Sequence, residues 1–347
     1  MHLASDNSGP VHPDIMAGLQ SANTGYALPY GNDALTERAI AKVRDVFEAP
    51  DAAVYFVATG TAANALLLST MMRPWQTIYC APEAHIAVDE CGAPEFYSGG
   101  GKLTLVGGKP DRITAEALAD AMNVHAGDDV HGVQQGPVSI TSVTEWGTLY
   151  QLDEIRDIAT VTHAHGQKLH LDGARFANAA EVLGCTAAEM SWKAGVDAVS
   201  FGGTKNGCMG VEAAVIFDPE LAWEFELRRK RGAHLFSKNR YLSAQMDAYL
   251  TDDLWRRMAA MANANGQKLA KGMLELPGVE MMYPPEANMI FARFPRAAHQ
   301  RLKAAGADYK MHGGLEGDPN EMIGSRLVAD WSLGADKIET FLDLLRG

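Results

Sequence analysis

Residues 1–250 alternate between short apolar runs rich in β-branched side chains and longer stretches with helical periodicity. Alternation of this kind is typical of an α/β domain with a largely parallel sheet. The expected strands are 53–58, 77–80, 137–143, 168–172, 196–201 and 211–217, and the expected helices are 35–48, 61–72, 114–124 and 152–165. Because such sheets bind ligands at the carboxyl ends of their strands, residues that follow these strands are the first candidates for a functional site.

The length of the chain favours more than one domain. Its 347 residues exceed the usual size of a single hydrophobic core. A helix-favouring segment begins at residue 218, and after Pro277-Gly278 the pattern changes to short strands and helices. We therefore expect a large domain of residues 1–250, which includes the N-terminal segment, and a small C-terminal α+β domain of residues 251–347.

Composition and charge disfavour several classes of protein. A net charge of −13 argues against a nucleic-acid partner, because phosphate neutralisation needs a basic surface. The uncharged run 52–72 is long enough for a membrane span, but polar residues interrupt it, so a buried strand, a turn and a buried helix are the preferred interpretation. The N-terminus lacks the pattern of a signal peptide. The four cysteines form no CxxC pair, which favours reduced thiols and a cytoplasmic location.

A glycine-rich turn directly after an apolar strand carries Lys205, in the sequence FGGTKNG of residues 201–207. Glycines let the backbone approach a ligand closely, and a lysine in such a turn can be the nucleophile that forms a Schiff base. An exposed turn lysine without a function explains the pattern equally well. The spacing GxxxxGK[ST] of a phosphate-binding loop is absent from this turn.

An aspartate, Asp172, ends the expected strand 168–172. A carboxylate in this position can pair with the protonated pyridine nitrogen of a pyridoxal-phosphate cofactor and keep the ring electron-withdrawing. The alternative is a capping role for a helix that begins near Arg175. The presence of Lys205 after the next strand favours the cofactor site.

Two further motifs add candidates. Residues 58–64 (ATGTAAN) join a strand to a helix, where free N–H groups and the helix dipole can bind an anion such as a cofactor phosphate. A helix cap without a ligand is the simpler alternative. His85 follows the strand 77–80, and its imidazole could stack on an aromatic cofactor, move a proton, or be an ordinary polar loop residue.

Together these motifs resemble the low-specificity L-threonine aldolases, which are fold type I (aspartate-aminotransferase-like) pyridoxal-phosphate enzymes. The resemblance runs from ASDN (4–7) and YGND (30–33) through GTAAN, LDGAR (171–175) and GGTKNG to SRLVADW (325–331), and covers nearly the whole chain. It implies cleavage of L-threonine, L-allo-threonine and related L-β-hydroxy-α-amino acids to glycine and an aldehyde. The alternatives are a phenylserine-selective aldolase or another fold type I lyase that acts on β-substituted amino acids.

The resemblance also implies roles for individual residues around the cofactor. Lys205 would bind pyridoxal phosphate as a Schiff base, Asp172 would pair with the pyridinium nitrogen, and His85 would stack over the ring. The residues implied in phosphate binding are Gly60, Thr61 and Thr204.

Substrate binding and assembly follow from the same resemblance. Arg175 would lie beside the phenolic oxygen of the cofactor and the substrate carboxylate, which Ser5 and Arg326 would bind. Family members are homo-oligomers that share active sites between subunits, so we expect a dimer or a tetramer. The residues expected to act on the neighbour's cofactor are Tyr30 and one basic residue among Arg228, Lys230 and Lys238.

The group that deprotonates the β-hydroxyl is left open by the sequence. Some members have a histidine near this hydroxyl, where the stretch TEWG (144–147) of this chain offers Glu145. The base could be His85, Glu145 or a water molecule that they hold, and Glu145 could instead be a structural carboxylate. We expect no metal site, and we interpret His163 and His165 as structural because no carboxylate lies in register with them on the expected helix.

Overall fold

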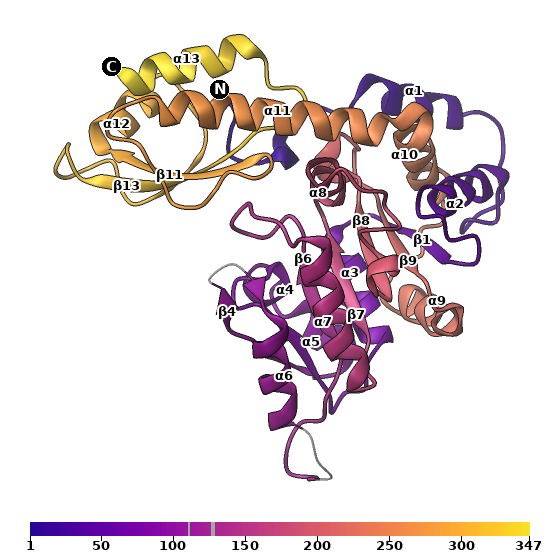
Figure 1. The fold of residues 1–347 in the computed structure, drawn as a ribbon. Coiled ribbons are helices and arrows are strands. Elements are labelled where there is room, and N and C mark those ends of the chain that lie inside the picture. The colour runs from indigo at the N-terminus through magenta and orange to yellow at the C-terminus, as the bar shows by residue number, and fades with distance from the viewer. Residues whose placement is uncertain (110–111, 126–128) are drawn as a thin grey trace.

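The computed structural model describes residues 1–109, 112–125 and 129–347 (Figure 1). Its larger part is built on a seven-stranded sheet in the order β1-β9-β8-β7-β6-β2-β3. These strands are β1 (Ala53–Val57), β9 (Glu212–Ile216), β8 (Ala198–Gly202), β7 (Leu169–Gly173), β6 (Val138–Thr141), β2 (Thr77–Cys80) and β3 (Lys102–Leu105). All six expected strands lie in this sheet, so the predicted fold class is confirmed.

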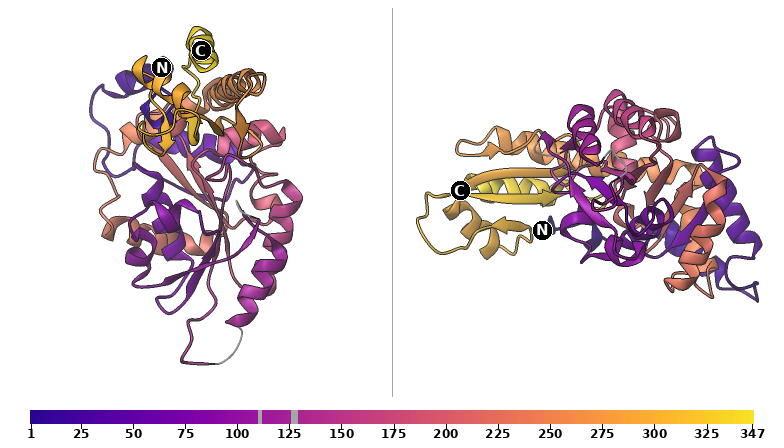
Figure 2. Two further views of the ribbon diagram at one scale, coloured as in Figure 1. Left: turned by 90° about the vertical axis from the view of Figure 1, so that its left-hand side faces the viewer. Right: turned by 90° about the horizontal axis from the view of Figure 1, so that it is seen from below.

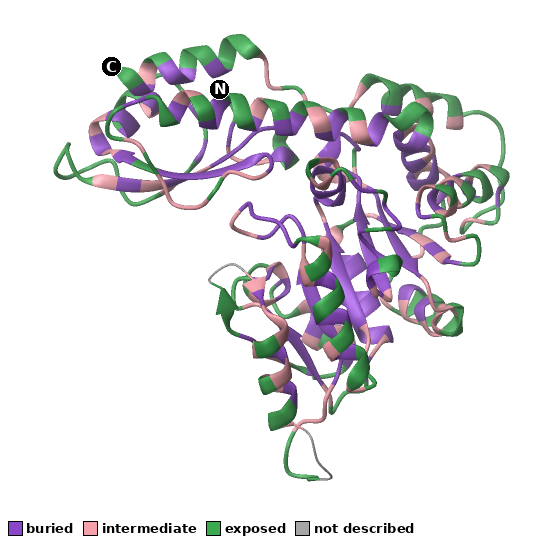
Figure 3. Cartoon of the chain, viewed as in Figure 1, coloured by how far each residue is buried: buried purple, intermediate pink, exposed green. Residues whose placement is uncertain are grey.

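Strand direction departs from a purely parallel sheet at β9. This strand is antiparallel to both of its neighbours, β1 and β8, whereas the pairs β8–β7, β7–β6, β6–β2 and β2–β3 are parallel. Every residue of β7, β8 and β9 is buried (Figure 3). Strands that are covered on both faces are apolar throughout, which is why the sequence marks them so clearly.

Helices cover both faces of this sheet, and the size of the strand side chains differs between the faces. Val199 and Phe201 of β8 pack into the core that includes helices α7 (Leu152–Ala164) and α8 (Phe176–Leu183). Ala198, which points the opposite way, lies in the core under helix α3 (Gly60–Thr70). The small side chain lets α3 approach the sheet closely.

The uncharged run 52–72 forms β1, a turn and the buried helix α3, as predicted. None of the helices within the described ranges is long and apolar enough to cross a membrane. The expected helices 35–48, 114–124 and 152–165 correspond to α2 (Ala34–Val46), α6 (Ala115–Val124) and α7. The remaining helices of this part are α1 (Pro13–Ala22), α4 (His85–Val88), α5 (Ala93–Ser98), α9 (Ala222–Arg231) and α10 (Arg240–Leu250). A separate two-stranded sheet pairs β4 (Gly108–Lys109) with β5 (Arg112–Ile113).

A second sheet forms the C-terminal part of the molecule (Figure 2). It has the order β10-β11-β13-β12 and is antiparallel throughout. Its strands are β10 (Glu280–Met281), β11 (Met289–Pro295), β13 (Met322–Val328) and β12 (Lys310–His312), and its helices are α11 (Leu254–Leu274), α12 (Arg296–Ala304) and α13 (Ala335–Arg346). The N-terminus also contributes to this part, because Leu3 is buried in its core and exchanges backbone hydrogen bonds with Asp308 and Val328. The division of the chain at residue 250 stays a prediction.

Candidate active site

The parallel strands β7 and β8 bring Asp172 and Lys205 to one edge of the sheet. Asp172 is paired with Ser200 in the register of these strands, and Lys205 lies in the short 3-10 helix η3 (Thr204–Asn206) directly after β8. Gly202 is needed here for space, because a Cβ atom on it would lie 2.4 Å from the carbonyl oxygen of Ala174. The turn therefore sits against the segment that follows Asp172.

A cleft opens at this edge and collects most of the candidate residues. It is lined by Asn7, Ala58, Thr59, Gly60, Thr61, Asn64, His85, Thr141, Val143, Glu145, Asp172, Ala174, Arg175, Thr204, Lys205 and Glu212. Eight predicted site residues are in this set: Gly60, Thr61, His85, Glu145, Asp172, Arg175, Thr204 and Lys205. Residues spread over nearly 150 positions of the sequence thus meet in one cleft, as the motifs together indicated.

The carboxylate of Asp172 is held from both sides. One oxygen, Oδ1, accepts the backbone N–H of Ala174 at 3.0 Å, and the other, Oδ2, accepts the side-chain amide of Asn64 at 2.9 Å. The same amide nitrogen donates to Glu90 Oε1 at 2.8 Å, and His85 Nδ1 lies 2.7 Å from that oxygen. A continuous hydrogen-bond chain through Asn64 and the buried Glu90 therefore connects Asp172 to His85, and both of these residues line the cleft.

Arg175 is paired with an acidic residue that the sequence did not single out. Its Nε and Nη2 atoms donate to Asp6 Oδ2 at 2.6 Å and Oδ1 at 2.9 Å, and both side chains are buried. Burial would raise the pKa of Asp6, but the charges of Arg175 and Lys205 outweigh it and lower this pKa. The N-terminal segment is therefore tied to the cleft by an ionised pair.

The N-terminus of α3 faces the cleft through Gly60 and Thr61. The Thr59 hydroxyl caps this helix by accepting the N–H of Ala62 at 3.1 Å, so the capping interpretation of this motif is confirmed, and anion binding stays a prediction. The first turn of a helix leaves its leading N–H groups without intrahelical acceptors, which here are those of Gly60 and Thr61. Thr204 and Lys205 line the same cleft, so helix dipole, amide hydrogens, a hydroxyl and an ammonium group converge there.

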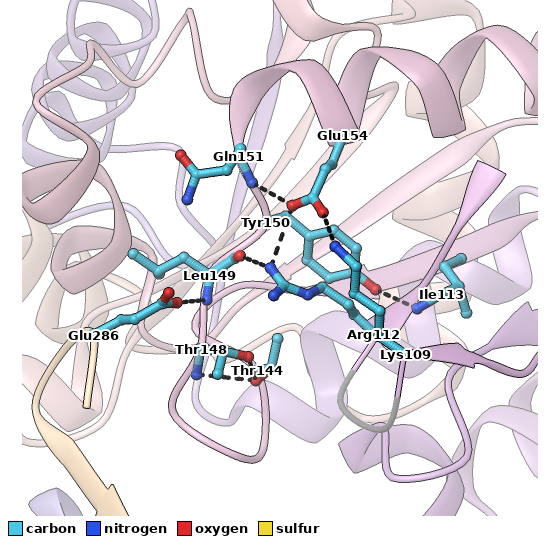
Figure 4. Close-up of polar contacts among 10 residues, drawn as sticks. All are labelled: Lys109, Arg112, Ile113, Thr144, Thr148, Leu149, Tyr150, Gln151, Glu154 and Glu286. Carbon is cyan, nitrogen blue, oxygen red and sulfur yellow. Dashed lines mark hydrogen bonds and ion pairs between the residues drawn. The ribbon is translucent and has the colours of Figure 1, made fainter. Parts of the chain in front are cut away.

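Glu145 lies in the loop between β6 and α7. Figure 4 shows the contacts that anchor this loop through Thr144, Thr148, Leu149 and Tyr150. The hydroxyl groups of Thr144 and Thr148 are 2.7 Å apart, and the Leu149 N–H donates to Glu286 of the C-terminal part at 2.6 Å. Further bonds tie the loop to the β5 segment, since Arg112 donates to the Leu149 carbonyl and the Ile113 N–H donates to the Tyr150 hydroxyl at 2.9 Å. The loop is thus held from two parts of the molecule.

The two candidate bases differ in their electrostatic surroundings. Burial raises the pKa of Glu145, although the charges of Arg175 and Lys205 oppose this shift. The hydrogen bond to Glu90 raises the pKa of His85, although burial opposes it. No hydrogen bond or ion pair joins the Glu145 carboxylate to another side chain among residues 1–109, 112–125 and 129–347. A raised pKa brings the Glu145 carboxylate closer to neutral pH, where a general base is most effective. A raised pKa keeps the His85 imidazole protonated up to a higher pH, which makes it less available as a base.

Arg326 and Ser5 lie next to the cleft and are not part of its lining. Arg326 is half-buried in β13, and its Nη2 atom donates to the Ala4 carbonyl at 2.9 Å. Its Nε atom is buried without a hydrogen-bond partner in the described part of the chain. The Ser5 hydroxyl accepts the N–H of Asn7 at 3.2 Å, so it caps a short 3-10 helix over Asp6–Ser8.

The residues expected to act across a subunit interface do not line this cleft. The Lys230 amine lies 5.2 Å from the centre of the Tyr30 ring, and the Tyr30 N–H donates to the Ser237 carbonyl, one residue before the exposed Lys238. Arg228 is instead engaged by Glu224 on its own helix, with Nη2–Oε1 at 2.7 Å. Tyr30, Lys230 and Lys238 therefore form a separate group on the surface.

The histidines at the end of α7 have structural partners. His163 Nε2 lies 2.9 Å from Asp197 Oδ2. Asp197 directly precedes β8 and is not on the helix, so the spacing of residues along the helix could not indicate this partner. His165 Nδ1 lies 2.9 Å from the Val161 carbonyl. Groups of three or more potential metal ligands do not occur within the three described stretches.

Among the polar residues that sequence reasoning missed, four are buried at the site: Asp6, Asn64, Glu90 and Glu212. Asp6 and Asn64 lie inside the motifs ASDN and GTAAN, but nothing in these motifs indicates their partners. Glu212 had a signal of its own, because it is the charged residue at the start of the otherwise apolar strand 211–217. A charge in a strand that is buried on both faces needs a compensating interaction.

Comparisons with known proteins agree with this geometry. A family model described as beta-eliminating lyase matches residues 2–295. A low specificity L-threonine aldolase of Pseudomonas aeruginosa is 39% identical over 336 residues, which cover 97% of this chain and 94% of that protein. Another from a Pseudomonas species is 41% identical over 304 residues, with coverage of 88% and 87%.

Solved structures give the same result for the fold. The structure of Leishmania major threonine aldolase superposes with a TM-score of 0.91 at 26% identity, and the match covers 99% of this chain and 98% of that one. A Sphingomonas wittichii serine palmitoyltransferase has a TM-score of 0.73 at 16% identity, with coverage of 100% and 86%, and shows likeness of fold alone. The chain therefore belongs to the beta-eliminating lyase family and, within it, to the low-specificity L-threonine aldolases.

Proposed function

We propose that this protein cleaves L-threonine, L-allo-threonine and related L-β-hydroxy-α-amino acids to glycine and an aldehyde, with pyridoxal phosphate as cofactor. The observation that carries this proposal is the meeting of Lys205, Asp172 and Arg175 in one cleft with the N-terminus of α3. The relatives named as low-specificity L-threonine aldolases support the same activity.

Groups that line the cleft fit the aldehyde, the ring nitrogen and the phosphate of this cofactor. The Lys205 amine matches its aldehyde, the Asp172 carboxylate matches its ring nitrogen, and the amides of Gly60 and Thr61 match its phosphate. The His85 imidazole, held by Glu90, offers a flat ring for stacking. When bound, pyridoxal phosphate supplies an electron sink for the bond that breaks at Cα.

The residues of the chain then divide the work on the substrate. Arg326 binds the carboxylate, since a guanidinium can read a planar anion with two contacts. Glu145 accepts the proton of the β-hydroxyl, which favours cleavage of the Cα–Cβ bond and release of the aldehyde. With the cofactor bound, the Asp172 carboxylate would hold its ring nitrogen and the Lys205 amine would hold its aldehyde carbon. The carboxylate contact orients the Cα–Cβ bond for cleavage.

The test of this proposal is the identity of the products. The purified holoenzyme would be assayed with L-threonine, L-allo-threonine and β-phenylserine, with glycine and aldehyde measured in equal amounts. Lys205→Ala is the control, because it removes the amine that binds the cofactor covalently. Without aldehyde from any of the three substrates, the proposal would be wrong.

A second candidate is favoured by the name of the matching family model, beta-eliminating lyase. An enzyme of this kind would release ammonia and a keto acid from a β-substituted amino acid. A phenylserine-selective aldolase would instead cleave β-phenylserine and leave both threonine isomers intact. The same product assay distinguishes these two activities from the one proposed.

We also propose a cytoplasmic homo-oligomer, a dimer or a tetramer, in which Tyr30 and Lys230 or Lys238 reach the cleft of a neighbouring subunit. The four free cysteines are in keeping with the reducing cytoplasm. Support for the assembly comes from the exposed group of Tyr30, Lys230 and Lys238, which does not line the cleft of its own chain. Mixing inactive Tyr30→Ala subunits with inactive Lys205→Ala subunits should restore activity if sites are shared, and no recovery would contradict this.

A further inference from the structure

Glu90 is a buried carboxylate that does not line the cleft, although two residues that do, His85 and Asn64, are bonded to it. It lies between α4 and α5, and its side chain is completely buried. Its Oε1 atom lies 2.7 Å from His85 Nδ1 and 2.8 Å from Asn64 Nδ2. Because a carboxylate is costly to bury without partners, these two bonds decide what Glu90 can do.

The Asn64 amide determines the direction of one of these bonds. Its nitrogen has two hydrogens, and it donates to Glu90 Oε1 at 2.8 Å and to Asp172 Oδ2 at 2.9 Å. An amide oxygen in this place would face two carboxylate oxygens, so the nitrogen must occupy it. Glu90 Oε1 is therefore an acceptor toward Asn64, and this bond favours the ionised form of the carboxylate.

The bond between Glu90 and His85 then determines which ring nitrogen carries a hydrogen. A contact of 2.7 Å between Oε1 and Nδ1 requires one hydrogen between them. A carboxylic acid, with an ordinary pKa of about 4.3, is a stronger acid than an imidazolium, with about 6.5, so this hydrogen belongs to Nδ1. The other nitrogen, Nε2, lies 3.7 Å from the exposed carboxylate of Asp89, which is beyond hydrogen-bond distance. His85 therefore keeps a hydrogen on Nδ1 in both charge states of the ring, and only Nε2 gains or loses a proton.

The same bond fixes how the His85 ring lies. A ring that is held at Nδ1 cannot turn about its bond to Cβ without losing the contact with Glu90, so its plane is set. Asn64 connects this ring to Asp172, because one amide nitrogen bonds both carboxylates. The ring proposed for stacking and the carboxylate proposed for the cofactor nitrogen are thus oriented by one chain of bonds.

We propose that Glu90 is a positioning residue of the proposed active site, which holds the His85 imidazole in one plane with a hydrogen on Nδ1. Through Asn64 it also joins the orientation of this ring to that of Asp172. The inference rests on the proposed function, because it takes pyridoxal phosphate as the ligand against which the ring lies. It gives a task to a carboxylate that does not itself line the cleft.

The charges near His85 are compatible with this role. The hydrogen bond to Glu90 raises the pKa of His85, although burial opposes it. The charges of Asp172, Glu90 and Glu145 raise this pKa further. Asp89 adds another carboxylate beside Nε2. All of these neighbours are acidic, so they stabilise hydrogens on the ring.

The position of the ring hydrogen can be read from long-range nitrogen–proton NMR correlations of the full-length protein, recorded with and without pyridoxal phosphate. His85→Asn assigns the His85 signals among the eleven histidines. Two histidines serve as internal references, because a backbone carbonyl can only accept. His165 carries its hydrogen on Nδ1, 2.9 Å from the Val161 carbonyl, and His299 on Nε2, 3.1 Å from the Ile323 carbonyl. At a pH where these rings are neutral, His85 should match His165, and a match to His299 would overturn the proposal.

Two variants of Glu90 test whether this residue is the cause. Glu90→Leu has a similar size and no acceptor, so Nδ1 should lose its fixed hydrogen and the midpoint of the His85 titration should fall. Glu90→Gln keeps an acceptor oxygen without the charge, so it should retain the hydrogen on Nδ1 with a lower midpoint. Asp197→Asn is the matched control, because Asp197 bonds His163 outside the cleft lining and should alter the signals of His163 alone. An unchanged His85 in Glu90→Leu would refute the role. If Glu90→Leu does not fold, an unchanged midpoint in Glu90→Gln has the same meaning.

The dissociation constant of pyridoxal phosphate gives the second measurement. In Glu90→Leu it should rise by roughly 2-fold to 12-fold, the value of one aromatic stacking contact. The rise should be smaller in a His85→Ala background, and an equal rise in both backgrounds would mean that Glu90 does not act through His85.

The outcomes also separate this inference from the proposed function. Wild-type protein that binds pyridoxal phosphate through Lys205, with the hydrogen of neutral His85 on Nε2, contradicts the role of Glu90 alone. Failure of the wild-type protein to bind the cofactor contradicts both.

Discussion

The guanidinium of Arg175 and the carboxylate of Asp6 form a two-pronged ion pair, with Nε–Oδ2 at 2.6 Å and Nη2–Oδ1 at 2.9 Å. The two residues are 169 positions apart in the chain. Asn288 of the C-terminal part also donates to Asp6, at Oδ2, over 3.2 Å. This pair therefore joins the N-terminal segment, the edge of the large sheet and the second sheet at the proposed site.

Replacing Asp6 with alanine should strongly destabilise the protein. The change leaves the buried Arg175 charge without its partner, which costs about 3–5 kcal/mol of unfolding free energy. Denaturant unfolding measures this value. Asp343→Asn is the control, since Asp343 forms an exposed pair with Arg346 at 2.8 Å and should change stability by less than about 1 kcal/mol. Equal losses in the two variants would contradict the importance of the Asp6 pair.

The same pair predicts a pH dependence of stability. The pKa of Asp6 is lower in the folded protein than in the unfolded chain. Its stabilising contribution is therefore fully present above the unfolded pKa and is lost as the pH falls through the folded pKa. In Asp6→Asn this part of the acid dependence should disappear, which unfolding experiments at several acidic pH values would detect.

Asp172→Asn should separate cofactor binding from catalysis. An amide still fills the space and still accepts the Ala174 N–H, so the variant should retain pyridoxal phosphate. It removes the negative charge beside the ring nitrogen, and kcat should fall by roughly 10²-fold to 10³-fold, the scale for loss of an electrostatic stabiliser. Cofactor content by absorbance and aldehyde release would be measured on one preparation. Full activity with bound cofactor would refute the pairing of Asp172 with the ring nitrogen.

The strands could be predicted from the sequence because most of them are buried on both faces and appear as continuous apolar runs. The direction of β9 could not, because a doubly covered strand has the same pattern whether it runs parallel or antiparallel to its neighbours. Similarly, the edge strand β3 (KLTL), which has no buried residue, has no apolar run that would mark it.

The site could be predicted at the level of motifs but not of contacts. Asp172 lies at the end of a strand, Lys205 and the turn at Gly60 each follow a strand, and strands that run in the same direction bring such positions to one edge of the sheet. The partners Asp6, Asn64 and Glu90 depend on how distant segments pack, and this information is not local to any motif. Asn64 shows this best, since one amide nitrogen serves Glu90 and Asp172 at 2.8 and 2.9 Å, 26 and 108 positions away.

Asn64→Leu should weaken the link between Asp172 and His85. The variant keeps a side chain of similar size but leaves the carboxylates of Asp172 and Glu90 without a shared donor, so each loses a hydrogen bond worth about 1–3 kcal/mol. We expect weaker retention of the cofactor and a lower unfolding free energy. Asn263→Leu is the control, because Asn263 bonds Asn178 in a buried position away from the cleft lining. It should lower stability without a specific loss of cofactor.

The pH dependence of the rate should identify the base. Glu145 acts when it is ionised, so the acid limb of kcat/KM should follow its raised pKa, with activity lost as the pH falls below it. Glu145→Gln should remove that limb and lower kcat by roughly 10²-fold to 10⁴-fold. His85→Ala should weaken cofactor binding and leave the limb in place. The reverse pattern, in which His85→Ala removes the limb, would make His85 the base.

Arg326→Ala should affect the amino acid much more than the cofactor. Arg326 lies outside the cleft lining, but its side chain has a buried Nε atom without a partner in the described residues, and Arg175 and Glu145 are close enough to affect its pKa. A carboxylate would supply the missing acceptor. Loss of charged hydrogen bonds worth about 1.5–3 kcal/mol raises KM by roughly 10-fold to 100-fold. Arg326→Lys keeps the charge but loses the planar fork, so it should recover only part of the affinity.

Because Arg326 does not line the cofactor position, the dissociation constant of pyridoxal phosphate should change little in either variant. A loss of cofactor affinity as large as the rise in KM would mean that Arg326 supports the cleft and does not read the substrate carboxylate.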